Sequence, residues 1–137
     1  MAENGLQGGA TTSLSLCVGA SDTAESAARE PWEDYPAVLA TPVMIMQMER
    51  AGAKLLQPLL DAGQLSVGVK LEITHFNPTP VGAEVVTHAR YLHQDGALYW
   101  FEVWSQDPAG LIGKGRHARA IVDRRDIENR AASRAPK

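Results

Sequence analysis

The sequence predicts an α+β fold in which one helix packs against a mainly antiparallel, five-stranded sheet. Three observations carry this prediction. Residues 42–60 form a single long amphipathic run, four segments with alternating apolar and polar residues follow it, and short turn-forming stretches separate most of those segments. A strand, a loop, a helix and then consecutive strands are typical of the α+β class. Because one helix cannot cover so wide a sheet, we expect the sheet to wrap around it and to pair with a second copy, as in a hotdog fold.

The region before the helix divides into three parts. Residues 1–13 are rich in Gly, Thr and Ser and are expected to be flexible. "LSLCV" at 14–18 is a short predicted strand, and 19–37 form a long loop that ends in "PWEDYP". A loop of that length in a compact domain is usually functional or disordered. Trp32 and Tyr35 favour a functional loop, because aromatic side chains seldom occur in a purely solvated linker.

The helix and the later strands have clear boundary signals. Thr41 is a suitable N-cap, Pro42 suits the first helical position, and "DAG" at 61–63 supplies the stop. The predicted strands are 65–76, 83–93, 97–106 and 111–123. The predicted domain therefore covers 14–123, and the basic tail 124–137 is expected to be solvated.

Composition excludes several classes of protein. With 137 residues, the chain fits one domain with its own core. Its net charge of -3 does not indicate binding to nucleic acid or to an anionic membrane. Cys17 is the only cysteine, so an internal disulfide is impossible, and no Cys/His cluster has the spacing of a metal site. The chain shows no signal-peptide pattern and no apolar run of roughly 18 residues. The expected location is the cytoplasm.

Two polar residues fall on apolar faces. At about 100° per residue, Glu49 lies with the apolar arc of the helix rather than with Arg50 and Lys54. In "VGVKLEITHF", strict alternation places His75 on the same face as Val67, Val69, Leu71 and Ile73. A buried carboxylate needs a partner, and a histidine is a natural one near neutral pH.

Each of these residues also has a structural interpretation. Thr41 could serve only as a helix cap, Glu49 could be a solvated flank of the helix, and His75 could be a structural histidine at a strand end. His88, His93 and His117 carry almost no positional signal. The combination of Thr41, Glu49 and His75 favours a functional site more strongly than any one of them does.

The segments "YPAVLATPVMIMQMERA" and "GVKLEITHFNPTPVG" resemble the hotdog-fold fluoroacetyl-CoA thioesterases, and the similarity returns in "IGKGRHARAIV". The resemblance implies that Thr41, Glu49 and His75 form a catalytic constellation for acyl-CoA hydrolysis. It also implies that Gly68 lies close to the thioester. No cofactor is implied, because coenzyme A enters as part of the substrate.

The resemblance also suggests binding residues. The family's fluoroacetyl enzyme has phenylalanines in a lid before the helix, where this chain has Trp32 and Tyr35, so its acyl preference is expected to differ. Lys114, Arg116 and Arg119 are candidate cations for the CoA phosphates.

The function predicted from the sequence is hydrolysis of a small acyl-CoA thioester by a homodimer. Two alternatives stay open at this point: a non-catalytic acyl-CoA or acyl-carrier binding protein, and a hydratase-like or dehydratase-like hotdog enzyme. Whether Thr41, Glu49 or an activated water is the nucleophile is also open.

Overall fold

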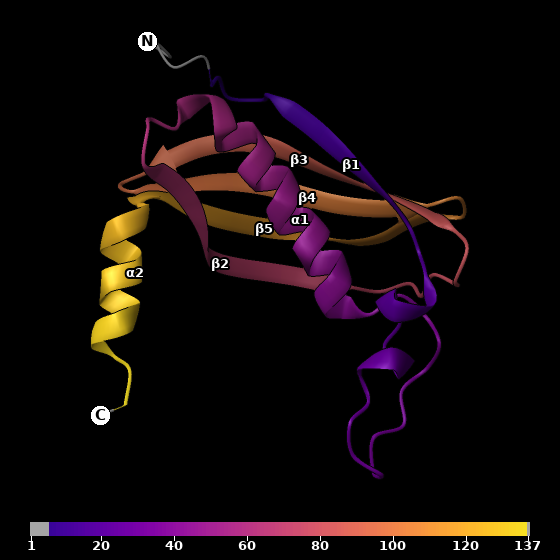
Figure 1. The fold of residues 1–137 in the computed structure, drawn as a ribbon. Helices are drawn as coiled ribbons and strands as arrows, with labels where there is room; N and C mark the ends of the chain where they lie inside the picture. The colour runs from indigo at the N-terminus through magenta and orange to yellow at the C-terminus, as the bar shows by residue number, and fades with distance from the viewer. Residues whose placement is uncertain (1–5, 137) are drawn as a thin grey trace.

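The computed structural model describes residues 6–136. Its elements are, in order, β1 (Thr11–Cys17), η1 (Ala20–Asp22), η2 (Glu25–Ala27), α1 (Thr41–Leu56), η3 (Gln57–Leu59), β2 (Gln64–His75), β3 (Glu84–Asp95), β4 (Leu98–Asp107), β5 (Gly110–Asp123) and α2 (Arg124–Ser133). The strands form one antiparallel sheet in the order β1-β3-β4-β5-β2, and the sheet curves around α1 (Figure 1). This is the α+β architecture that the sequence predicts.

The core lies between α1 and the face of the sheet that curves around it. Met44, Met48 and Leu56 of α1 are fully buried, as are Phe101 and Val103 of β4. These side chains recur at helical spacing on α1 and at every second position on the strand, so each element presents one apolar face. Their packing fixes α1 across the middle of the sheet.

The start of α1 differs from the prediction. Ala40 is the N-cap residue, with φ -71° and ψ 140°, and Thr41 is the first helical residue. The backbone carbonyl of Ala40 accepts from the N–H groups of Val43 and Met44. Thr41 makes no capping hydrogen bond. The prediction that Thr41 caps the helix is therefore wrong, and its hydroxyl is available for another contact.

β2 contains a bulge that reverses which side chains face the helix. The pairing with β5 shifts between Gly68 and Lys70, so that Val69 is the extra residue. Leu71 and Ile73 lie opposite His117 and Gly115, whereas Gly68 lies opposite Arg119. Directly opposed residues share a face. Strict alternation through Val67 and Val69 to His75 is therefore wrong, and Gly68 shares the helix-facing side with His75.

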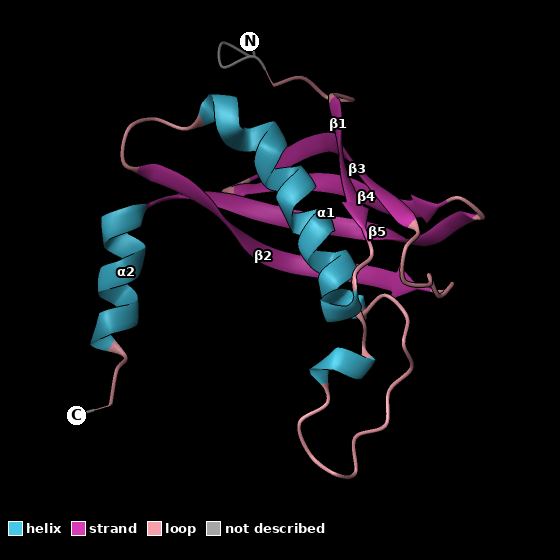
Figure 2. Ribbon diagram, turned by 45° about the vertical axis from the view of Figure 1, so that its right-hand side comes forward, coloured by secondary structure: helices cyan, strands magenta, loops and turns pink. Residues whose placement is uncertain are grey.

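The loop between β1 and α1 folds back beside the start of the helix (Figure 2). Isolated bridges join Thr23 to Leu39 and Val38 to Pro80, and the N–H of Ala40 donates to the carbonyl of Asp22. These bonds anchor the two ends of the loop, while its tip extends away from the sheet (Figure 2). The segment expected to be a long loop is thus tied down where it meets α1.

The two ends of the chain contain more regular structure than expected. Thr11–Ser13, assigned to the flexible N-terminal segment, belong to β1, and residues 1–5 of that segment lie outside the described residues. The basic tail contains α2, whose N-cap Asp123 accepts from the N–H of Asp126. Within residues 6–136, no helix is long and apolar enough to cross a membrane.

Candidate active site

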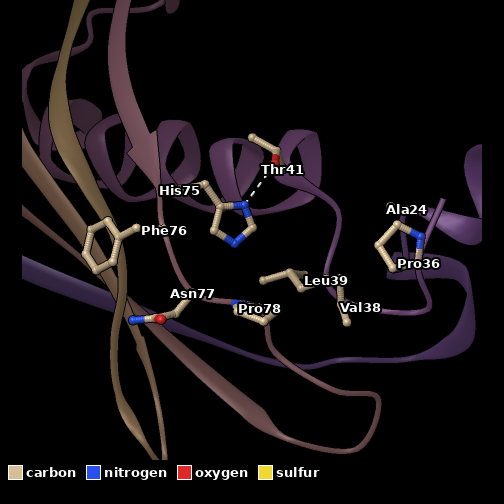
Figure 3. A pocket seen from close by; sticks show the side chains of 9 residues that line it. All are labelled: Ala24, Pro36, Val38, Leu39, Thr41, His75, Phe76, Asn77 and Pro78. Carbon is tan, nitrogen blue, oxygen red and sulfur yellow. Dashed lines mark hydrogen bonds between the residues drawn. The ribbon is translucent and has the colours of Figure 1, made fainter.

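Thr41 and His75 are in direct contact where both line a pocket (Figure 3). Thr41 is in the first turn of α1 and His75 ends β2, and Thr41 Oγ1 lies 2.8 Å from His75 Nδ1. The pocket measures about 340 Å³. Its other lining residues are Ala24, Pro36, Val38, Leu39, Phe76, Asn77 and Pro78.

The second ring nitrogen of His75 is what makes this contact chemically useful. His75 Nε2 is buried and has no hydrogen-bond partner among the described residues. It points toward the side chains that line the pocket (Figure 3). A buried, unpaired ring nitrogen is costly, so it is poised to bind a polar group that enters the pocket. If Nδ1 accepts from Thr41, His75 can take the hydroxyl proton; if Nδ1 donates, Nε2 is the free base.

Glu49 lies apart from this pair within the single chain. It follows Thr41 by eight residues on α1, which corresponds to about 12 Å along the helix axis. Its Oε1 is 3.5 Å from Arg119 Nη1, and its side chain is 28% exposed. The prediction that Glu49 points inward, toward the rim of the core, agrees with this position. Convergence of Glu49 with Thr41 and His75 on one pocket does not occur within one chain.

Gly68 lies directly against the carboxylate of Glu49. A Cβ atom added to Gly68 would lie 2.4 Å from Glu49 Oε1 and 3.3 Å from His117 Cε1. Only a residue without a side chain leaves room for the carboxylate in this position. The bulge at Val69 is the cause, because it turns Gly68 toward α1.

Arg119 is buried rather than available to phosphate. The residue is 7% exposed. Its Nε donates to Ser66 Oγ at 2.9 Å and its Nη2 donates to the Ser66 carbonyl at 3.0 Å. Burial lowers the pKa of Arg119, and the carboxylate of Glu49 opposes that shift. These contacts contradict the expected role of Arg119 as a surface cation and place it beside Glu49.

Lys114 and Arg116 lie on the face of the sheet that α1 does not cover. Both are exposed, and they alternate with Gly113 and His117, which face α1. The Arg116 guanidinium lies over the ring of Trp100, 4.6 Å from its centre. The single chain therefore does not bring either cation to the Thr41–His75 pocket.

The two expected lid residues are also outside the pocket. Trp32 is 75% exposed and Tyr35 is 37% exposed, and neither lines the cavity beside His75. The loop contributes Pro36, Val38 and Leu39 instead.

His117 is the residue that the sequence analysis missed. It is fully buried, and it bridges the Lys70 carbonyl and Arg119 Nη1. The one available signal was its spacing of two from Arg119 in "GRHARA", which puts both side chains on one face of a strand. Within residues 6–136, no cluster of three or more His, Cys, Asp and Glu side chains could hold a metal ion.

Comparison with known proteins gives this geometry its context. The sequence model of the fluoroacetyl-CoA-specific thioesterase (FlK) family matches residues 18–125. This chain belongs to that family. A fluoroacetyl-CoA thioesterase of Streptantibioticus cattleyicolor is 29% identical over 103 residues, which is 75% of this chain and 74% of that protein.

Solved structures agree with the FlK-family assignment. A structure of the fluoroacetyl-CoA thioesterase FlK has a TM-score of 0.91 at 26% identity, covering 96% of this chain and 99% of that one. A Thermus thermophilus protein described as a thioesterase superfamily member has a TM-score of 0.83 at 26% identity, covering 93% of this chain and 91% of that one. These comparisons confirm the hotdog fold and the resemblance that the sequence motifs indicated.

Proposed function

We propose that this protein is an acyl-CoA thioesterase that hydrolyses a small acyl-CoA to the free acid and CoA. Family membership supports the reaction class. The observation that carries the assignment of the site is the contact between Thr41 Oγ1 and His75 Nδ1 beside a pocket of about 340 Å³. The two alternatives, an acyl-CoA binder without activity and a hydratase-like enzyme, are not favoured by relatives that are described as thioesterases.

The chemistry of this pair suits thioester hydrolysis. His75 takes a proton from the attacking oxygen, which belongs either to Thr41 or to a water. That oxygen forms a bond to the thioester carbon, the C–S bond breaks, and the proton passes to the leaving CoA thiolate. If Thr41 attacks, a water then hydrolyses the acyl-threonine ester. The backbone N–H groups at the N-terminus of α1, beside Thr41, would stabilise the negative charge that develops on the carbonyl oxygen.

Glu49 joins the pair in the proposed homodimer. β2 is at the edge of the sheet, and Val69 and Leu71 expose 50% and 43% of their surfaces. A long exposed apolar edge strand is a template for pairing with another chain. A two-fold axis between Leu71 and Glu72 would pair two antiparallel copies of β2, so that His75 lies beside Gly68 of the partner subunit. Glu49 of the partner subunit would then complete the site.

In this dimer the Glu49 carboxylate would assist catalysis at the partner's Thr41–His75 pair. Glu49, held by Arg119, would polarise the attacking water or stabilise the protonated form of His75 across the interface. The wall formed by Val38 and Leu39 would limit the acyl group to a small one. Trp32 and Tyr35 would act as lid residues over the bound acyl group. The enzyme would work in the cytoplasm, where a free thiol such as Cys17 stays reduced.

Subunit complementation tests this arrangement. His75→Ala and Glu49→Gln variants are each purified, mixed, unfolded and refolded together, and CoA release is measured with a thiol reagent. Each mixed dimer would hold one intact site and one doubly damaged site. Because half of the dimers in an equal mixture are mixed, activity should recover to about a quarter of the wild-type value.

The complementation test needs each variant refolded alone and a check that mixed dimers have formed. Each variant refolded alone should stay inactive. No recovery in mixtures that contain mixed dimers would show that Glu49 and His75 do not act across an interface. A monomer in solution with full activity would contradict the dimer itself.

A further inference from the structure

His117 is buried in the centre of β5, between α1 and β2. It is fully inaccessible to solvent. A Cβ atom on Gly52 of α1 would lie 3.2 Å from His117 Cδ2, and one on Gly68 of β2 would lie 3.3 Å from His117 Cε1. Two glycines therefore let the helix and the strand approach the imidazole closely from two sides. Such close packing holds the ring in one orientation.

The two hydrogen bonds of His117 allow a single protonation state. Nδ1 is 2.9 Å from the Lys70 carbonyl oxygen, and Nε2 is 3.1 Å from Arg119 Nη1. A carbonyl oxygen can only accept, so Nδ1 carries the hydrogen. An arginine can only donate, so Nε2 accepts. His117 is therefore the neutral Nδ1–H tautomer.

Arg119 Nη1 lies between His117 and Glu49. Nη1 is 3.1 Å from His117 Nε2 and 3.5 Å from Glu49 Oε1. The other side of the guanidinium is anchored to Ser66. The acceptor on His117 thus holds the one nitrogen of Arg119 that faces the carboxylate.

We infer that His117 is a positioning residue of the thioesterase site, whose neutral Nε2 holds Arg119 against Glu49 and so fixes the place of that carboxylate. This inference rests on the proposed role of Glu49 in hydrolysis. A residue that orients a functional group through a hydrogen bond typically contributes about 10-fold to 100-fold to activity in metal sites, and the same order is expected here.

The charges around His117 explain why it must stay neutral. Glu49 faces it from α1 and Arg119 from its own strand, the Lys70 backbone faces it from β2, and the apolar ring of Phe101 packs near it from β4. In a protonated ring, the Nε2–H of His117 would point at an N–H of Arg119 Nη1. Two hydrogen-bond donors, each carrying a positive charge, would then face each other. Burial lowers the pKa of His117, which favours the neutral form.

Two amide substitutions separate the two hydrogen bonds of the ring. His117→Gln can place an acceptor oxygen near the Nε2 position, whereas His117→Asn can keep the donor to Lys70 but does not reach Arg119. We expect His117→Gln to keep kcat within about threefold of wild type, and His117→Asn to lose about 10-fold to 100-fold in kcat with KM nearly unchanged. In a Glu49→Gln background, His117→Asn should add less than about a twofold loss, because the two residues act as a unit.

The outcomes are distinct. Equal kcat values for folded His117→Gln and His117→Asn, with strongly reduced turnover in Glu49→Gln, would overturn this inference alone. The inference would also be overturned if the loss of kcat in each variant followed its loss of melting temperature and not the absence of an acceptor for Arg119. Near-normal turnover in Glu49→Gln protein would overturn the proposed role of Glu49, and this inference with it.

Discussion

Thr41 and His75 are 34 positions apart in the sequence, yet Thr41 Oγ1 and His75 Nδ1 are 2.8 Å apart. The contact exists because the first turn of α1 lies against the last residue of the edge strand β2. The contact engages Nδ1 of the imidazole. The other ring nitrogen, Nε2, is buried and has no hydrogen-bond partner in the described part of the chain. This arrangement suits the proposed role of His75 as a base that acts on its neighbouring hydroxyl or on a bound water.

Removing the Thr41 hydroxyl should reduce activity with little effect on stability. Thr41→Ala eliminates the contact with His75, so we expect kcat/KM to fall by about 10-fold or more, as for loss of a group that assists proton transfer. Thr41 is exposed and makes no capping bond, so the free energy of unfolding should change by no more than about 0.5 kcal/mol. Thr41→Ser is the matched control and should keep most of the activity. A loss of stability as large as that of a lost helix cap would contradict the assignment of Ala40 as N-cap.

Adding a methyl group at Gly68 should displace the Glu49 carboxylate. The new Cβ atom of Gly68→Ala would lie 2.4 Å from Glu49 Oε1, which is too close for both to keep their places. We expect turnover to fall by about 10-fold or more while the fold is retained, since a displaced acid–base group loses most of its contribution. Gly8→Ala is the control, because its nearest atom would be the Leu92 carbonyl oxygen at an ordinary 3.5 Å. Unchanged kcat for Gly68→Ala would show that the position of Glu49 is not critical.

The loop aromatics should affect acyl preference rather than stability. Trp32 is 75% exposed and Tyr35 is 37% exposed, so alanine removes little buried surface at Trp32 and a moderate amount at Tyr35. The double variant should shift the ratio of kcat/KM among a panel of acyl-CoAs, while its melting temperature stays near that of wild type. Val38→Ala, at a residue that lines the pocket, is the comparison variant. An unchanged substrate profile with a large drop in melting temperature would make the two aromatics packing residues.

Acid should weaken the fold partly through His117. Its folded-state pKa is lowered from the ordinary value of 6.5, so the unfolded chain binds more protons below that pH. The stabilisation is present above pH 6.5 and is lost as pH falls toward the folded-state pKa. The difference in free energy of unfolding between wild type and His117→Gln should therefore shrink between about pH 7.5 and about pH 5, as followed by denaturant titration. Parallel pH profiles for the two proteins would contradict this.

The sequence by itself determined the long helix, the five strands and the family, although it did not indicate α2. The periodicity of α1, the turns at Asn77–Gly82, Gln94–Gly96 and Asp107–Gly110, and the family motif around Thr41 and His75 are local patterns. Local patterns are readable because helix and strand periods place side chains without reference to the rest of the chain. The thioesterase family and the hotdog fold followed from them, and the comparisons confirm both.

Tertiary structure alone decided which side chains meet. One extra residue at Val69 reverses the faces of β2 and sets Gly68 against Glu49, and the alternation of side chains along the strand does not record that bulge. The burial of Arg119 and His117 likewise depends on pairing between β2 and β5 and on the close approach of α1 at Gly52. These are contacts between residues distant in sequence, whose geometry is set by register and packing. A sequence pattern that records only the period of each element does not contain them.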